Sequence, residues 1–145
     1  MSSPSHSESI AALRSSIKEL FDEIEADDSR TDNGVVLEQL RTNSHHLKKA
    51  YSYYAQAEYL AALTADEESK IKAEVMLELL RNKAALTFKV EHLNSLVLSD
   101  PAVQEAQDHR RRAKRLHLEA KGPVEAIMRR AFALNSIAAA LMKLE

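Results

Sequence analysis

Apolar residues recur along this chain at spacings of three and four, the period of helices that bury one side. The clearest stretch lies between residues 8 and 26, where the two spacings alternate. Its members are Ile10, Leu13, Ile17, Leu20 and Ile24, with Phe21 widening the stripe. Such alternation forms a heptad seam, along which one helix packs lengthwise against another. The pattern therefore predicts an amphipathic helix over 8–26.

Polar residues and turn formers flank this helix on both sides. Residues 1–7 are rich in serine and predict a disordered tail, and Ser5 with Glu8 has the spacing of a capping box. Residues 27–34 read DDSRTDNG, and Asp, Asn and Gly favour turns. We therefore expect a hinge between the helix 8–26 and a helical bundle over 35–145.

Two long stripes of apolar residues follow the hinge. They predict helices over 35–63 and 66–98, with a break near Thr64, because Thr64 and Glu67 repeat the capping-box spacing. Neither glycine nor proline enforces this break, so one continuous helix is the alternative.

Capping residues and prolines predict two helix boundaries in the last third of the chain. Asp100 and Pro101 suit the cap and the first position of a helix over 101–120. Gly122 is expected to cap the end of that helix, and Pro123 to open a last helix that runs towards the end of the chain.

The scarcity of turn residues indicates the fold class. The chain has two glycines and three prolines in 145 residues, far below the average usage of about 7% and 5%. Sheets need tight turns, so we predict an all-α protein. Its expected form is an elongated bundle of four to five amphipathic helices, with 35–63 and 66–98 as a long, coiled-coil-like antiparallel hairpin.

Composition narrows the function classes. The chain lacks cysteine, a Gly-rich phosphate loop, a nucleophile elbow and an HExxH motif, and its six histidines show no metal-ligand spacing on a helix. We therefore expect no enzyme activity, no metal, no cofactor and no small-molecule substrate. No apolar run approaches the roughly 18 residues of a membrane span, so we expect a soluble intracellular protein without membrane contact.

Charge is distributed unevenly along the chain. The net charge is −2, but residues 1–33 hold eight acidic and three basic residues, whereas 101–121 hold six basic and three acidic ones. The basic residues cluster in the run HRRRAKR at 109–115. Its cations are Arg110, Arg111, Arg112, Lys114 and Arg115.

This basic run has three interpretations. It could contact nucleic-acid phosphates, it could act as a nuclear-import signal, or it could be a solvated face that pairs with the acidic first helix. The slightly acidic balance of the whole chain counts against a dedicated nucleic-acid-binding protein.

A cluster of tyrosines is the second notable feature. It consists of Tyr51, Tyr53, Tyr54 and Tyr59, which cannot all face one core from a single helix. Tyrosine is enriched at protein interfaces because its ring is apolar and its tip is polar. Part of this set is expected to contact a partner, and the alternative is the edge of the bundle.

These features favour a non-enzymatic scaffold or adaptor subunit of a multiprotein complex, acting by helix–helix packing. Its partner would be a second copy or another subunit, contacted through the tyrosines and the apolar seam of 8–26, Phe21 included. The alternative is a nucleic-acid-associated nuclear protein that uses the helix around 109–115. A small all-helical enzyme is the third and least favoured class.

Overall fold

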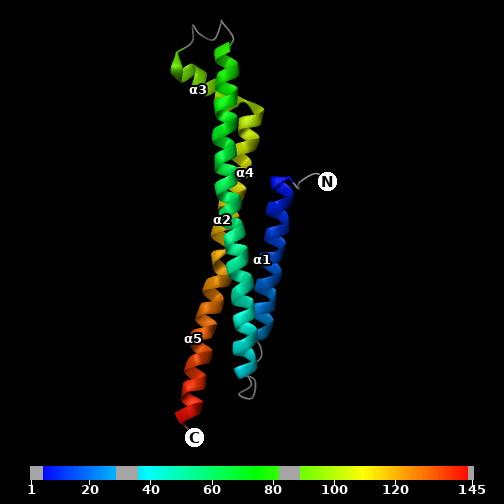
Figure 1. The fold of residues 1–145 in the computed structure, drawn as a ribbon, viewed down its shortest axis with the longest axis vertical. Coiled ribbons are helices and arrows are strands. Elements are labelled where there is room, and N and C mark those ends of the chain that lie inside the picture. The colour runs from blue at the N-terminus through cyan, green and yellow to red at the C-terminus, as the bar shows by residue number, and fades with distance from the viewer. Residues whose placement is uncertain (1–4, 29–35, 82–88, 144–145) are drawn as a thin grey trace.

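The fold is an all-α bundle, as the sequence predicts. A computed structural model describes residues 5–28, 36–81 and 89–143, and most of the expected hinge 27–34 lies outside this part of the chain. Five helices account for the regular structure of the described residues. They are α1 His6–Asp28, α2 Val36–Arg81, α3 Val90–Ser99, α4 Pro101–Glu119 and α5 Lys121–Lys143 (Figure 1).

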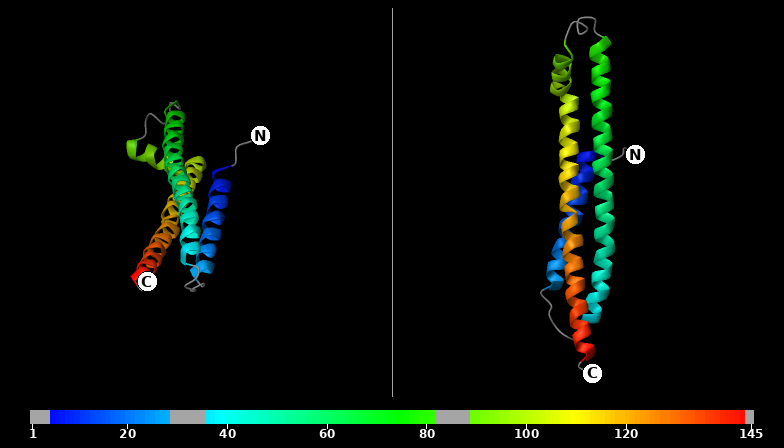
Figure 2. Two further views of the ribbon diagram at one scale, coloured as in Figure 1. Left: turned by 60° about the horizontal axis from the view of Figure 1, so that its bottom comes forward. Right: turned by 90° about the vertical axis from the view of Figure 1, so that its left-hand side faces the viewer.

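The long antiparallel pair is made by different helices from those expected. α2 runs along most of the molecule, and α4 and α5 follow one another as a bent rod beside it, in the opposite direction (Figures 1 and 2). α1 lies against this pair, and the short α3 lies near the end of α2. The predicted hairpin of 35–63 with 66–98 is therefore wrong in its members, because residues 66–81 continue α2.

Thr64 explains why the expected break is absent. Its hydroxyl donates to the carbonyl oxygens of Leu60 (2.8 Å) and Ala61 (3.1 Å), and the side chain is buried inside α2. Bonding to the preceding turn satisfies the hydroxyl without ending the helix. The capping-box spacing with Glu67 was therefore a misleading signal.

The junction of α4 and α5 also differs from the prediction. Ala120 keeps right-handed helical dihedrals (φ −66°, ψ −16°), and its N–H donates to the carbonyl oxygen of Leu116 at 2.9 Å. Pro123 lies in the first turn of α5, where a missing N–H is tolerated. Gly122 has no positive φ and caps nothing. It lies beneath the ring of Phe21 from α1.

Two predicted capping interactions are present, although α1 begins at His6, so that His6 and Ser7 belong to the helix and not to the expected tail. The carboxylate of Asp100 accepts the N–H of Ala102 at 2.9 Å, and Pro101 opens α4. At the start of α1, the Ser5 N–H donates to Glu8 Oε2 and the Glu8 N–H donates to Ser5 Oγ, both at 3.3 Å. Local side-chain chemistry therefore fixes both helix starts.

The core forms where the seam of α1 meets small side chains of the antiparallel pair. Ile10, Leu13 and Ile17 pack in one cluster and Leu20 and Ile24 in a second, and all five are buried. The residues that receive them are Ala50, Ala57, Ala113, Leu116, Ala120 and Ile127. Alanines let the helices approach closely while the larger α1 side chains fill the space between them.

We expect Gly122→Ala to destabilise the protein, although alanine normally favours a helix over glycine. A Cβ at this position would lie 3.0 Å from Cε2 of Phe21, which should lower the free energy of unfolding by about 1–3 kcal/mol. In a Phe21→Ala background, the same change should stabilise the protein by about 0.5–1 kcal/mol. Urea denaturation of the four proteins tests this reversal, and the same sign in both backgrounds would contradict it.

Candidate functional site

A cleft lined by arginines lies between α1 and α4. Its volume is about 400 Å³. Three of its arginines, Arg111, Arg112 and Arg115, come from α4, and Arg14 comes from α1. The remaining lining residues are Ser7, Ile10, Ala11 and Asp108. One carboxylate among four guanidinium groups makes the cleft cationic, which suits an anion.

Helical spacing presents these arginines together. Asp108, Arg111, Arg112 and Arg115 recur at intervals of three and four on α4, so they share one face. The neighbouring face of α4 is buried through Val103, Ala106, Ala113 and Leu116. That burial fixes the rotation of α4 and turns the arginines towards α1.

The cleft keeps cations that no described carboxylate neutralises. Arg112 pairs with Asp108 at 3.1 Å, and Arg14 pairs with Glu119 at 3.4 Å. Both pairs are solvent-exposed, so each contributes little to stability. Arg111 and Arg115 are exposed and make no ion pair with another residue in the described part of the chain. Their planar guanidinium groups can bind a phosphate in bidentate fashion.

The structure divides the predicted basic set. Arg111, Arg112 and Arg115 line the cleft, Lys114 is exposed outside its lining, and Arg110 pairs with Glu68 of α2. The sequence pattern did not indicate Arg14, because it is one of two basic residues in a helix that is acidic overall. The available signal was its place directly after the seam residue Leu13, which puts it at the edge of the packed face.

Glu68 is a buried carboxylate that joins α2 to α4. Its exposed fraction is 4%, and its oxygens lie 2.8 Å from Lys72 Nζ and 2.5 Å from Arg110 Nε. Burial by itself raises the pKa of Glu68. The hydrogen bond from Lys72, the charges of Arg110 and Lys72 and a hydrogen bond from Gln107 together hold this pKa below its ordinary value of 4.5. Glu68 is therefore ionised at neutral pH and holds Arg110 in place.

Side-chain contacts of His6 and His109 hold the first turn of α1 beside the cleft. His6 Nε2 lies 2.6 Å from Glu67 Oε2, and Ser7 Oγ lies 3.2 Å from His109 Nε2. The His6 and His109 rings meet edge to face, with centroids 5.9 Å apart. Because Glu67 belongs to α2 and His109 to α4, these contacts position α1 against both helices. Within the described ranges, no group of three or more His, Asp or Glu side chains could hold a metal ion.

The predicted protein-contact residues range from buried to exposed. The seam of α1 is buried inside the chain's own core, and Phe21 is half-buried against Gly122. Tyr53 and Tyr54 pack partly buried against the core, and the Tyr54 ring lies 4.9 Å from that of His117. Tyr51 and Tyr59 are exposed. Among the four tyrosines, only these two expose most of their surface while α1 remains packed.

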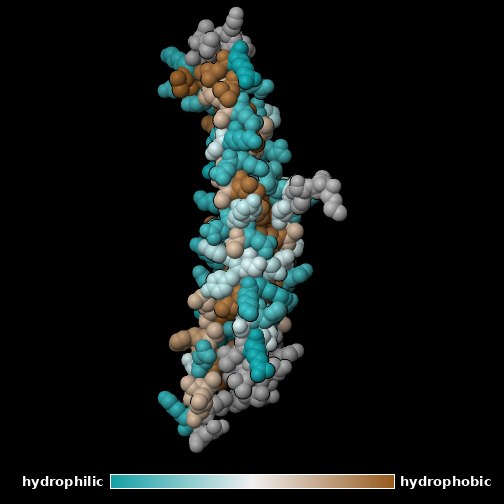
Figure 3. Space-filling view, viewed as in Figure 1, coloured by the Kyte–Doolittle hydropathy of each residue, from teal (hydrophilic) through white to brown (hydrophobic). Residues whose placement is uncertain are grey.

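A second apolar stripe lies on the outer side of α5. Met128, Phe132 and Met142 are 54%, 77% and 76% exposed. With Asn135 and Ala139, they follow the spacing 4-3-4-3 of a heptad seam. A neighbouring face of α5, about 100° round the helix, packs inward through Ile127 and Leu134. Figure 3 shows apolar side chains gathered over the lower part of α5.

Comparisons with protein-family models, curated proteins and solved structures find no match to this chain. None of the helices, within the residues described, is both long and apolar enough to cross a membrane. The candidate sites described above are the arginine cleft and the outer stripe of α5.

We expect Glu68→Gln to weaken the fold in a pH-dependent manner. The folded-state pKa of Glu68 is lowered, so its ionisation stabilises the protein above pH 4.5, and this contribution is lost as the pH falls through the folded-state pKa. At neutral pH the substitution should lower the free energy of unfolding by about 1–3 kcal/mol.

Urea denaturation at several pH values measures this difference, which should shrink in acid. Glu78→Gln is the matched control, because Glu78 is an exposed carboxylate on the same helix. An equal loss for both variants, or a loss that does not change with pH, would contradict the assignment.

Proposed function

We propose that this protein is a non-enzymatic helical subunit that assembles by helix–helix packing through the outer stripe of α5. The observation that carries the proposal is the exposure of Met128, Phe132 and Met142 along one heptad seam. Large exposed apolar patches on soluble proteins mark interaction sites. Asn135, at the centre of the seam, is the kind of polar step that fixes register between packed helices.

The partner surface differs from the one that the sequence favours. The seam of α1 contributes to the core, so exposing it to a partner would cost the burial of five large side chains. The outer stripe of α5 needs no such rearrangement. Association through this stripe therefore avoids the free-energy cost of unpacking α1.

A second candidate function, favoured by the arginine cleft, is binding to the phosphate backbone of a nucleic acid. Arg14, Arg111 and Arg115 approach one space from two helices, and arginine pairs well with phosphate oxygens. The overall charge of −2 confines the attraction to this face. Nuclear import through residues 109–115 belongs to the same candidate.

For assembly, we expect Phe132→Asp to abolish association of the protein with other chains. The reason is that a carboxylate replaces the largest exposed side chain of the stripe. Light scattering of the purified chain and co-purification from its native cell measure the change. Leu118→Asp is the matched control, since Leu118 is an exposed apolar residue on α4. The same associated mass for both variants, or none for the unmodified chain, would refute the proposal.

For nucleic-acid binding, we expect Arg111→Ala with Arg115→Ala to weaken binding of a single-stranded oligonucleotide by about tenfold or more at low salt. The slope of log affinity against log salt should fall by about one for each phosphate contact removed. Fluorescence anisotropy at several salt concentrations measures both quantities. Arg81→Ala serves as the control, because it removes an exposed arginine from the end of α2. Absent or salt-insensitive binding would reject this candidate.

A further inference from the structure

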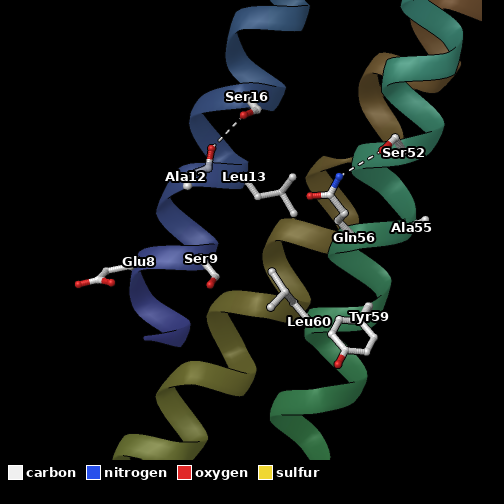
Figure 4. Close-up of a pocket in the computed structure, with 10 residues that line it drawn as sticks. All are labelled: Glu8, Ser9, Ala12, Leu13, Ser16, Ser52, Ala55, Gln56, Tyr59 and Leu60. Carbon is white, nitrogen blue, oxygen red and sulfur yellow. Dashed lines mark hydrogen bonds between the residues drawn. The ribbon is translucent and has the colours of Figure 1, made fainter. Parts of the chain in front are cut away.

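An open groove of about 780 Å³ runs between α1 and α2 (Figure 4). Small side chains line much of its length. They are Ser9, Ala12 and Ser16 from α1, and Ser52 and Ala55 from α2. Leu13, Gln56, Tyr59 and Leu60 complete its wall with Glu8. The lining residues span nine positions on each helix, which corresponds to about 12 Å, or more than two helical turns.

Some polar groups of this groove are paired within the chain. Ser16 Oγ donates to the carbonyl oxygen of Ala12 at 3.1 Å, and Gln56 Nε2 donates to Ser52 Oγ at 3.2 Å (Figure 4). These two contacts occupy three of the polar side chains of the groove, Ser16, Ser52 and Gln56. Its small residues leave room for bulky apolar side chains from outside.

The outer stripe of α5 carries larger exposed apolar side chains. Met128 and Phe132 lie one turn apart on this stripe. Met142 lies further along, and Ala139 is between Phe132 and Met142. A ridge of large side chains on one helix fits a groove of small side chains between two others. Two turns of this ridge match the length of the groove.

Charge favours the same pairing. α1 carries seven acidic and two basic residues, whereas α5 carries four basic and one acidic residue. On α1, Glu8 lines the groove, and helical spacing places the exposed Glu19 on the same side. On α5, the exposed Lys121 and Arg129 lie beside the stripe by the same criterion. The two surfaces would attract one another.

We propose that the groove between α1 and α2 of one copy receives the outer stripe of α5 from a second copy of this chain. This inference rests on the proposed assembly function and names its partner surface. Groove and stripe are different surfaces, so the contact is heterologous. Each added copy leaves one groove and one stripe free, which produces a ring or a filament instead of a closed two-fold dimer.

Complementation between two variants tests the proposal. Phe132→Asp disrupts the stripe, and Ala12→Lys places a long cation in the groove, opposite a basic helix. Each variant alone should have the mass of one chain by light scattering. An equimolar mixture should form a dimer, because one intact groove meets one intact stripe. Circular dichroism and thermal unfolding establish that both variants fold.

Three outcomes would overturn the inference, and they differ in what they mean for assembly. If Phe132→Asp abolishes association but Ala12→Lys does not, α5 packs against another surface, and the proposed function stands. If the unmodified chain is monomeric but a co-purified protein cross-links to α5, the function stands with a different partner. If neither association is detected, the inference and the proposed function both fail.

Disulfide trapping gives an independent readout, because the chain has no cysteine of its own. Mixing Ala12→Cys with Phe132→Cys under mild oxidation should give a cross-linked heterodimer in at least tenfold excess over a mixture of Ala12→Cys with Leu118→Cys. Rapid cross-linking of Phe132→Cys alone, with no enrichment in the mixture, would show stripe-to-stripe packing and refute the inference.

Discussion

The packing of large α1 side chains onto alanines of the antiparallel pair is the contact on which the rest of this structure depends. Leu20 and Ile24 meet Ala50 and Ile127, while Ile17 lies in the cluster with Ala113. Small residues bring α2 and the α4–α5 rod close together, and the branched side chains of α1 fill the remaining space. Loss of α1 would expose the apolar faces that it covers on the pair, and it would also remove one wall of both the groove and the arginine cleft.

Buried charge sets the register between α2 and α4. Glu68 accepts contacts from Lys72 on its own helix and from Arg110 on α4. A buried carboxylate left without these partners would be strongly destabilising, so the contact resists sliding of one helix along the other. By holding Arg110, the same interaction adds to the apolar burial that turns Arg111 and Arg115 towards α1.

The proposed assembly contact and the proposed phosphate-binding cleft would reinforce one another. Copies joined from groove to stripe would repeat the arginine cleft at regular intervals along the assembly. Weak phosphate contacts at each cleft would then combine, because linked sites bind at a high effective concentration. The modest charge of a single chain is compatible with such a mechanism, since the cations act as a repeated local surface.

The sequence by itself determined the features that depend on neighbouring residues. The heptad spacing of Ile10–Ile24 identified the buried face of α1, and Asp100 with Pro101 identified the start of α4, because helical period and capping act within one or two turns. Only the tertiary structure decided that Thr64 lies inside a continuous helix, since its hydroxyl can cap a helix or bond to the preceding turn. The same holds for the cleft. Arg14 and Arg111 are far apart in the chain, and the packing of α1 against α4 brings them together. The spacing of residues along one helix cannot specify that packing.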